Sequence, residues 1–320
     1  MGNHHTRGGG EVNQDLLVIV GPTAVGKTAL SLKLAKEFSG EIISGDSMQV
    51  YRQMDIGTAK ATVEERKEVP HHMIDLIDPD TSFSVQEFQQ LAQKSILEVY
   101  LRGHLPMLVG GTGLYVESIT HGYHMPRVPE NREYRAKLAA LAEKEGNEAL
   151  HRRLQEVDPE TASRLHPNDR RRIIRALEVY NETGKRFSEL KKKEPSPYRL
   201  LWIGLTMPRP LLYQRINERV DQMMAKGLVD EVRKLKEKGY HRGLTSMQAI
   251  GYKEIISYLD GEMTLEEAVD LIKKGTRKFA KRQLSWFRRI PEIHWFDVTH
   301  DQVYAQIQQL VAGKFPCYRE

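Results

Sequence analysis

The chain has 320 residues, of which 40% are hydrophobic and 28% are charged, so it is long enough for one large globular domain with a smaller one attached. No apolar run approaches the roughly 20 residues of a membrane span, and no signal-peptide core follows the start. The single cysteine, Cys317, excludes a disulfide framework within the chain and a cysteine-rich zinc site, which favours a reducing, cytoplasmic location. The net charge of +5 permits a nucleic-acid partner without requiring one.

The first structural signal is a strand that runs into a glycine-rich loop. Residues 1–14 are polar and Gly-rich and are expected to form a flexible leader, to which we assign no function. The apolar residues 16–20 then predict a buried parallel strand. The pattern G-x-x-x-x-G-K-[ST] follows, formed by Gly21, Pro22, Thr23, Ala24, Val25, Gly26, Lys27 and Thr28. In this P-loop pattern backbone N–H groups surround an anion, the lysine reaches its outer oxygens and the threonine holds Mg²⁺. The loop predicts binding of a di- or triphosphate with Mg²⁺, without specifying a nucleotide.

Strand and helix patterns alternate after the loop. Strands are predicted at residues 41–47 and 105–115, with a helix at residues 84–102 between them. A Pro-rich break near residue 124 leads into charged, helical sequence, and strand patterns return at residues 200–207 and 293–298. This order predicts an α/β fold of the P-loop type, with a doubly wound parallel sheet whose ligands bind at the carboxyl ends of the strands. The predicted core comprises residues 15–123 and 199–320, and a helical insertion domain occupies residues 124–198.

Two basic segments favour an RNA partner. The insert contains a run of arginines: Arg164, Arg170, Arg171, Arg172 and Arg175. Residues 273–289 hold eight Lys/Arg and no acid, with Phe279, Trp286 and Phe287 among them. Basic groups neutralise phosphates, and aromatic faces stack on unpaired bases. The alternative is a solvated helix face whose aromatic residues belong to the core, but two such segments beside a phosphate-binding loop favour RNA.

Three carboxylates are candidates for chemistry next to the loop. Asp46 follows the second predicted strand and is either a Mg²⁺ ligand or a base that accepts a proton, with a structural turn cap as the alternative. Asp75 and Asp78 follow short apolar runs and compete with it as acidic partners of the loop. The adjacent His71 and His72 receive no role, because neighbouring side chains point to different sides on most backbones and a shared metal is not expected.

Taken together, the motifs resemble one family. The segments GPTAVGKT, SGDSMQVYRQMDIGTAK, LVGGTGLY, HPNDRRRIIRALEVY, AIGYKE and AKRQLSWFRR occur in the order and spacing of the bacterial tRNA dimethylallyltransferases, over about residues 15–300. The resemblance implies transfer of a dimethylallyl group from dimethylallyl diphosphate to the exocyclic amine of the adenosine next to the anticodon of tRNA. It also implies that the P-loop holds a diphosphate that leaves.

The resemblance further implies a role for individual residues. Asp46 would accept the proton of the amine, and Thr112 would hydrogen-bond near the reacting groups. Lys27, the loop amides and Mg²⁺ on Thr28 would stabilise the departing diphosphate. Arg219 would approach the diphosphate from the opposite side, with Arg215 as a further helper. The tRNA contacts that the resemblance implies are Asp46, Ser47, Met48, Gln49, Arg135, Arg171, Arg172, Ile173, Ile174, Arg175, Gln248, Lys281, Arg282 and Gln283. The enzyme is expected to act as a monomer.

Other activities use the same kind of loop. A P-loop kinase for a nucleoside or metabolite would transfer a phosphoryl group and would not need the basic insert. An RNA-binding switch or motor would hydrolyse a nucleotide without a covalent product. The predicted strand at residues 105–115 ends in glycines and a threonine, where a hydrolase often has its acidic Mg²⁺ ligand, which argues against both. An adenylate isopentenyltransferase would prenylate a free nucleotide, and the basic insert speaks against it.

Overall fold

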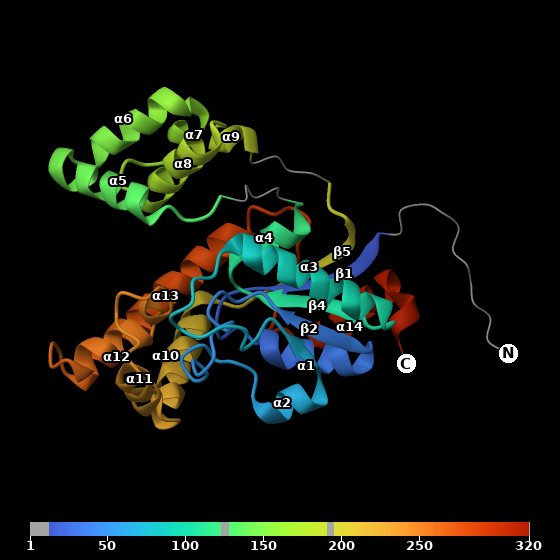
Figure 1. Cartoon of the computed structure of the whole chain (residues 1–320). Helices are drawn as coiled ribbons and strands as arrows, with labels where there is room; N and C mark the ends of the chain where they lie inside the picture. Colours follow the sequence, from blue (N-terminus) through green and yellow to red (C-terminus); the bar gives the residue numbers. More distant parts are fainter. Residues whose placement is uncertain (1–12, 123–127, 191–194, 320) are drawn as a thin grey trace. The chain divides into compact units, whose positions relative to one another are not determined.

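The computed structural model shows two compact units (Figure 1). Unit 1 comprises Met1–Thr120 and Pro197–Glu320, and unit 2 comprises His121–Ser196. The structure describes residues 13–122, 128–190 and 195–319, so most of the expected leader at residues 1–14 lies outside the described residues. Within these described ranges, no helix is long and apolar enough to cross a membrane.

Unit 1 is built on a parallel sheet, which has six strands among the described residues, in the order β3-β2-β4-β1-β5-β6. The strands are β1 (Gln14–Val20), β2 (Gly40–Ser44), β3 (His71–His72), β4 (Leu105–Gly110), β5 (Tyr198–Thr206) and β6 (His294–Asp297). Strand β1 lies at the centre, pairing with β4 on one side and β5 on the other. The chain therefore winds outward from β1 in both directions, which confirms the predicted doubly wound fold.

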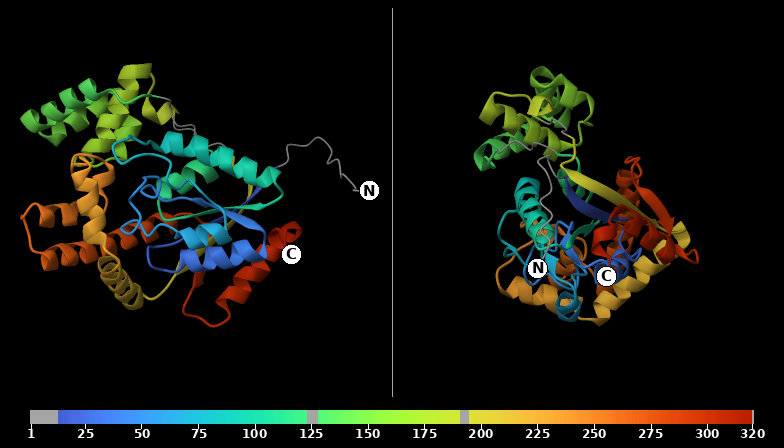
Figure 2. Two further views of the ribbon diagram at one scale, coloured as in Figure 1. Left: turned by 60° about the horizontal axis from the view of Figure 1, so that its bottom comes forward. Right: turned by 90° about the vertical axis from the view of Figure 1, so that its right-hand side faces the viewer.

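Helices cover both faces of this sheet, because adjacent residues of a strand point to opposite faces and both faces are apolar. Leu17 and Ile19 of β1 pack with α1 (Lys27–Glu37) and α14 (Val303–Lys314). Leu16 and Val18 pack on the other face with α3 (Val85–Leu101) and α4 (Gly113–Thr120). Two further views show this sheet as the middle of three layers, with helices on both of its faces (Figure 2).

A second group of helices in unit 1 forms its own core beside the sheet. The elements are α10 (Arg209–Ala225), α11 (Leu228–Glu237), η1 (Ser246–Gln248), α12 (Tyr252–Leu259) and α13 (Leu265–Phe287). Val50, Tyr51 and Met54, from the segment after β2, are buried in this core. The segment after β2 is therefore held between the sheet and these helices. The remaining elements of unit 1 are α2 (Val63–Glu68) and η2 (Pro316–Tyr318).

Most predicted elements are confirmed, with one clear error. The strands predicted at residues 16–20, 200–207 and 293–298 form, and the helix predicted at residues 84–102 has a capping box in which the Ser84 hydroxyl and Glu87 cap each other's backbone N–H groups. The strand predicted at residues 105–115 is wrong beyond Gly110, because residues 113–120 form helix α4. The chain turns where a Cβ on Gly110 would lie 2.5 Å from the backbone of Gly45, and Val116 then packs back onto the sheet.

All regular elements described in unit 2 are helices. They are α5 (Arg132–Glu145), α6 (Asn147–Val157), α7 (Pro159–Ser163), α8 (Arg170–Thr183) and α9 (Phe187–Leu190). Leu138, Leu150, Leu154, Ile173 and Leu177 form the centre of a separate hydrophobic core. Unit 2 thus has its own apolar interior, as an insertion domain requires.

Candidate active site

A cavity of about 630 Å³ opens in unit 1 at the carboxyl ends of β1, β2 and β4. Its wall is formed by the P-loop, the segment after β2, the turn after β4 and helices α10 and α13. The cavity therefore lies where a doubly wound sheet binds its ligands. Among the predicted site residues, those that line it include Lys27, Thr28, Asp46, Thr112, Arg219 and Gln283.

The backbone of the P-loop requires glycine at two positions. Gly21 has φ +155°, and a Cβ there would lie 2.7 Å from the carbonyl oxygen of Leu205. Gly26 has φ +110° and stands immediately before α1, which begins at Lys27. The N–H groups of the first turn of α1 have no partner within the helix, and their partial positive charge favours an anion. The loop is thus shaped to hold a phosphate group.

Lys27 folds back over this loop. Its Nζ donates to the carbonyl oxygens of Gly21 and Pro22, each at 2.9 Å. Burial and the nearby charge of Arg219 lower the pKa of Lys27 to about 7, against the opposing effect of Asp46. Lys27 is therefore a cation whose charge depends on pH near neutrality, and an anion in the cavity would stabilise the charged form.

Asp46 is the carboxylate of this cavity. It is half-buried just beyond β2, and its Oδ1 accepts a hydrogen bond from the Met48 N–H at 2.8 Å. Burial raises the pKa of Asp46, although the Met48 N–H and Lys27 act in the opposite direction. Within the described part of the chain, Asp46 forms no ion pair. A carboxylate with a raised pKa in a cavity is a candidate proton acceptor.

The two competing carboxylates are engaged elsewhere. Asp75 pairs with Lys60 at 2.6 Å and with Arg66 at 2.7 Å. Asp78 pairs with Arg52 at 3.1 Å. Neither lines the cavity. Of the three candidate carboxylates, Asp46 is thus the one that lines the cavity. Nor do the described residues bring His71 and His72 into a group of metal-ligating side chains.

Two side chains join the loops around the cavity. Thr112 Oγ1 accepts from the Ser47 N–H at 3.1 Å, which ties the turn after β4 to the segment after β2. Gln283 reaches the P-loop from α13: its Oε1 accepts from the Thr23 N–H at 2.9 Å, and its Nε2 donates to the Gly111 carbonyl at 3.2 Å. Only 6% of Gln283 is exposed. The structure thus gives Gln283 a role that the sequence did not predict, because its amide holds the P-loop to the β4 turn.

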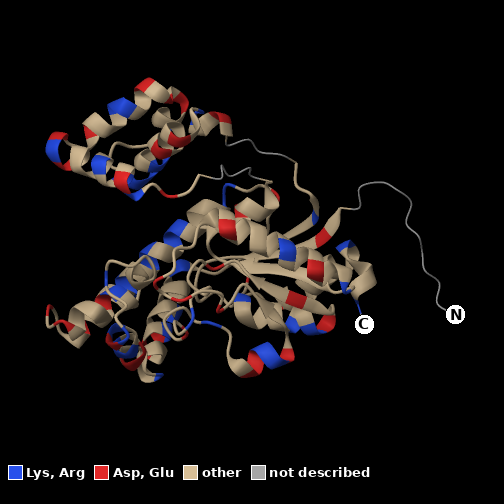
Figure 3. Ribbon diagram, viewed as in Figure 1, with Lys and Arg blue, Asp and Glu red and all other residues tan. Residues whose placement is uncertain are grey.

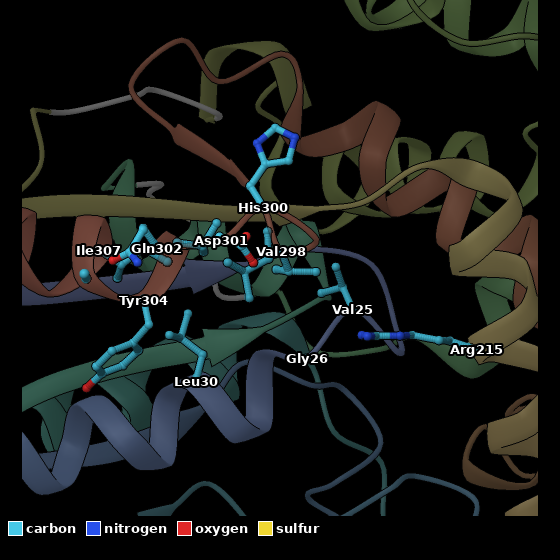
Figure 4. A pocket seen from close by; sticks show the side chains of 13 residues that line it. Val25, Gly26, Leu30, Arg215, Val298, His300, Asp301, Gln302, Tyr304 and Ile307 are labelled. Atoms are coloured by element: carbon cyan, nitrogen blue, oxygen red, sulfur yellow. The ribbon is translucent and has the colours of Figure 1, made fainter.

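The two arginines of α10 lie in different pockets. Arg219 lines the cavity together with Lys27, and burial lowers its pKa against the opposing effect of Asp46. Arg215 instead lines a second pocket of about 610 Å³, and its side chain extends toward Val25 and Gly26 (Figure 4). Gly26 lines both pockets, so the P-loop lies between them. Arg215 therefore lines a different pocket from Arg219, the arginine that it was expected to help.

Several predicted tRNA contacts of unit 1 lie around the cavity. Ser47, Met48, Gln49, Gln248 and Arg282 line it, and Lys281 is exposed next to Arg282 on α13. Other Lys and Arg residues lie along α13 (Figure 3). The aromatic residues of α13 differ in position. Phe279 lines the cavity, whereas Phe287 is buried in the core between the sheet and helices α3 and α4. Trp286 packs against the same core as Phe287, so Phe279 is the one of these three aromatic residues that lines the cavity.

The predicted tRNA contacts of unit 2 need a correction. Ile173 and Ile174 belong to its hydrophobic core, with 0% and 9% exposed, so their side chains cannot contact tRNA. Arg135 and Arg175 both bind the buried carboxylate of Glu178, at 2.8 and 2.6 Å. By contrast, Arg171 and Arg172 are exposed and form no ion pair within the described part of the chain. Helical periodicity decides this division, because positions 173 and 174 face inward when 171 and 172 face water.

These features define a class of protein. The chain is a P-loop protein of the α/β type, in which a lysine and an arginine line one cavity together with a carboxylate of raised pKa. Comparison with known proteins then specifies the family. The IPP transferase model matches residues 49–290, and the isopentenyl transferase model matches residues 14–76.

Relatives match over nearly the whole chain. A tRNA dimethylallyltransferase of Halalkalibacterium halodurans is 52% identical, over 95% of this chain and 98% of that protein. One of Carboxydothermus hydrogenoformans is 54% identical, over 89% and 93%. The crystal structure of the tRNA isopentenylpyrophosphate transferase from Bacillus halodurans superposes with a TM-score of 0.71 at 52% identity, covering 94% of this chain and 96% of that one. A eukaryotic dimethylallyltransferase acting on tRNA gives 0.78 at 30% identity, covering 96% and 80%. The chain belongs to the tRNA dimethylallyltransferase family.

Proposed function

We propose that the cavity transfers a dimethylallyl group from dimethylallyl diphosphate to the exocyclic amine of the adenosine next to the anticodon of tRNA, with release of diphosphate. The family supports a prenyl transfer to tRNA. The observation that carries the assignment of this cavity is the convergence of Lys27, Arg219 and Asp46 in its wall. Two cations suit a leaving diphosphate, and a carboxylate of raised pKa suits a nucleophile that must lose a proton.

In the reaction, the bond between the allylic carbon and the diphosphate oxygen breaks, and its electron pair leaves with the diphosphate. Lys27 and Arg219 stabilise the negative charge that grows on that oxygen, which is the interaction that lowers such a barrier most. The lone pair of the adenine amine forms the new N–C bond. The nitrogen then gives a proton to Asp46, and Thr112 holds the segment that carries this residue.

We propose Mg²⁺ as the cofactor. Thr28 is exposed at the start of α1 and lines the cavity. Mg²⁺ prefers oxygen ligands and keeps several waters, so one hydroxyl together with diphosphate oxygens suits it. When bound, the ion would neutralise charge on the diphosphate.

We propose that tRNA meets the protein at the rim of the cavity and at the exposed arginines of unit 2. The target base must leave its stack to enter a cavity, at a cost of a few kcal/mol that phosphate contacts elsewhere offset. Arg282 and Lys281 in unit 1, and Arg171 and Arg172 in unit 2, supply such contacts. Every residue named for the chemistry comes from unit 1 of one chain, so we propose that the enzyme acts as a monomer. We also propose that it works in the cytoplasm.

One experiment tests the reaction, the donor and the acceptor together. The purified protein is incubated with Mg²⁺, radiolabelled dimethylallyl diphosphate and unmodified tRNA, followed by nucleoside analysis. Parallel incubations contain AMP or ATP in place of tRNA. We expect label in a tRNA adenosine and none on AMP. Label on AMP alone would indicate an adenylate isopentenyltransferase, and phosphate release from ATP without transfer would indicate a kinase or hydrolase.

A further inference from the structure

Residues 54–60 form a turn in the cavity wall, and one carboxylate on α11 holds that turn. Glu231 Oε1 accepts from the Asp55 N–H at 3.1 Å, and its Oε2 accepts from the Ile56 N–H at 2.9 Å. The Gly57 N–H lies 3.5 Å from Oε1. The hydroxyl of Tyr252, on α12, donates to the same Oε1 at 2.5 Å. Glu231 itself does not line the cavity, so any effect that it has on the chemistry passes through this turn.

The turn is fixed on its other sides as well. Tyr252 is fully buried, and a Cβ on Gly57 would lie 2.4 Å from its ring, so the turn lies directly against that ring. Lys60, whose side chain is 1% exposed, donates from Nζ to the Tyr51 carbonyl at 2.7 Å and to Asp55 at 2.8 Å. These contacts leave the turn little freedom to shift while Glu231 is in place.

A continuous set of hydrogen bonds leads from this turn to Asp46. The Thr58 carbonyl accepts from Gln49 Nε2 at 3.1 Å. Gln49 Oε1 accepts from the Ser44 hydroxyl at 2.7 Å. Ser44 Oγ in turn accepts from the Asp46 N–H at 3.4 Å. The position of the turn thus sets where Gln49 is held, and Gln49 with Ser44 sets the backbone on which Asp46 stands.

We propose that Glu231 is a positioning residue for the transfer reaction, which fixes Asp46 in the cavity through the turn at residues 54–60 and Gln49. The inference rests on the proposed function, since it takes Asp46 as the base. Misplacing a reacting group by about 1 Å costs up to about a hundredfold in rate. A residue outside the cavity that fixes such a group therefore affects turnover more than substrate binding.

The first test is Glu231→Gln. This side chain keeps the size of glutamate, but it presents an NH₂ group to backbone N–H groups that need an acceptor. We expect kcat to fall about tenfold, with the KM for dimethylallyl diphosphate within about twofold of the parent. The matched control is Asp230→Asn, because Asp230 precedes Glu231 on α11, is exposed and, among the described residues, pairs only with the exposed Arg233. The control should leave kcat unchanged. An unchanged kcat in Glu231→Gln would overturn the proposal.

The second test separates positioning from general support of the fold. Glu231→Gln is introduced into an Asp46→Ala background, and single-turnover rates are measured. If Glu231 acts through Asp46, its effect disappears in that background. A further loss equal to that seen in the parent overturns the proposal. An Asp46→Ala single variant with full turnover would instead remove Asp46 as the base, which is a failure of the proposed function and is distinguishable from the first result.

Tyr252→Phe gives a milder third variant in case Glu231→Gln folds poorly. It removes one donor to Glu231 but keeps the ring that supports Gly57. We expect a loss of a few-fold in kcat, which also disappears in the Asp46→Ala background. A loss that persists there counts against the proposal.

Discussion

One carboxylate lies at the start of strand β2 and another lies just beyond its end, and their surroundings shift their pKa values in opposite directions. Glu41, at the start, is 3% exposed and accepts hydrogen bonds from Arg102 at 2.6 Å, His72 at 2.6 Å and His104 at 2.7 Å. Asp46, beyond the end, accepts from the backbone and forms no ion pair with the described residues. The same chemical group thus occurs once surrounded by cationic and imidazole donors and once nearly free of side-chain partners.

The pKa values follow this difference. Burial alone would raise the pKa of Glu41, but the hydrogen bonds from Arg102, His72 and His104 outweigh it and lower that pKa to about 2. At Asp46 burial is the larger effect, and the pKa is raised. Glu41 is therefore a permanent anion that holds structure together, whereas Asp46 can take up a proton. The number of donors that face a buried carboxylate decides between the two roles.

The largest expected effect is that of Asp46→Ala on turnover. Loss of a positioned base lowers kcat about a hundredfold or more, while the affinity for tRNA changes less. Single-turnover transfer to tRNA and a tRNA-binding titration measure the two quantities. Full turnover of Asp46→Ala would contradict the difference in role between the two carboxylates, because Asp46 would then have no more chemical role than Glu41.

Glu41→Gln should affect stability and leave turnover alone. It removes the charge that Arg102 and the two histidines surround, and a lowering of the pKa from 4.5 to about 2 corresponds to about 3 kcal/mol of stability. Urea denaturation measures the loss, and kcat per folded enzyme should stay the same. The control is Glu68→Gln, because the Glu68 side chain is 54% exposed and its one ion pair among the described residues is with the exposed Lys36. It should cost about 1 kcal/mol or less.

Acid titration tests whether the charge of Glu41 stabilises the fold. Because the pKa of Glu41 is lower in the folded than in the unfolded chain, its stabilisation is present above pH 4.5 and is lost as the pH falls toward about 2. The difference in stability between the parent and Glu41→Gln should therefore shrink over that interval. A constant difference would show that the charge of Glu41 is not what stabilises the fold.

The cations that face Asp46 give a pH dependence near neutrality. The pKa of Lys27 is lowered to about 7, so the free enzyme loses this charge as the pH rises above that value. Binding of dimethylallyl diphosphate should weaken by up to about tenfold per pH unit above 7, since binding then requires uptake of a proton. Calorimetric titration at several pH values measures this. Lys27→Met should bind weakly at every pH, and a dependence that persisted there would assign the effect to another group.

The smallest expected effect is that of the unit 2 arginines on the salt dependence of tRNA binding. Replacing Arg171 and Arg172 together by alanine should lower the salt dependence of tRNA binding by up to about two units of slope, because both are exposed and unpaired among the described residues. Arg175→Ala should leave the slope nearly unchanged and lower the stability of unit 2, because Arg175 binds Glu178. Equal slopes for the two variants would mean that pairing with Glu178 does not withhold Arg175 from phosphate.

Much of this protein follows from the sequence alone. The pattern from Gly21 to Thr28 needs a strand before it and a helix after it, and both form. The alternation of strand and helix patterns predicts the doubly wound sheet, since parallel neighbours need helical crossovers. The position of Asp46 after a buried strand places it at the ligand-binding edge. These features depend on residues close together in the chain, which is why local patterns reveal them.

Tertiary structure decided which of the candidate groups are free to act. Asp75 differs from Asp46 because Lys60 and Arg66 fold onto it, and Gln283 holds the P-loop across a separation of 260 residues. Arg215 and Arg219 are one helical turn apart, yet the P-loop lies between their pockets. Burial, pKa and hydrogen-bond partners depend on contacts between distant residues, and no local pattern in the sequence encodes those contacts.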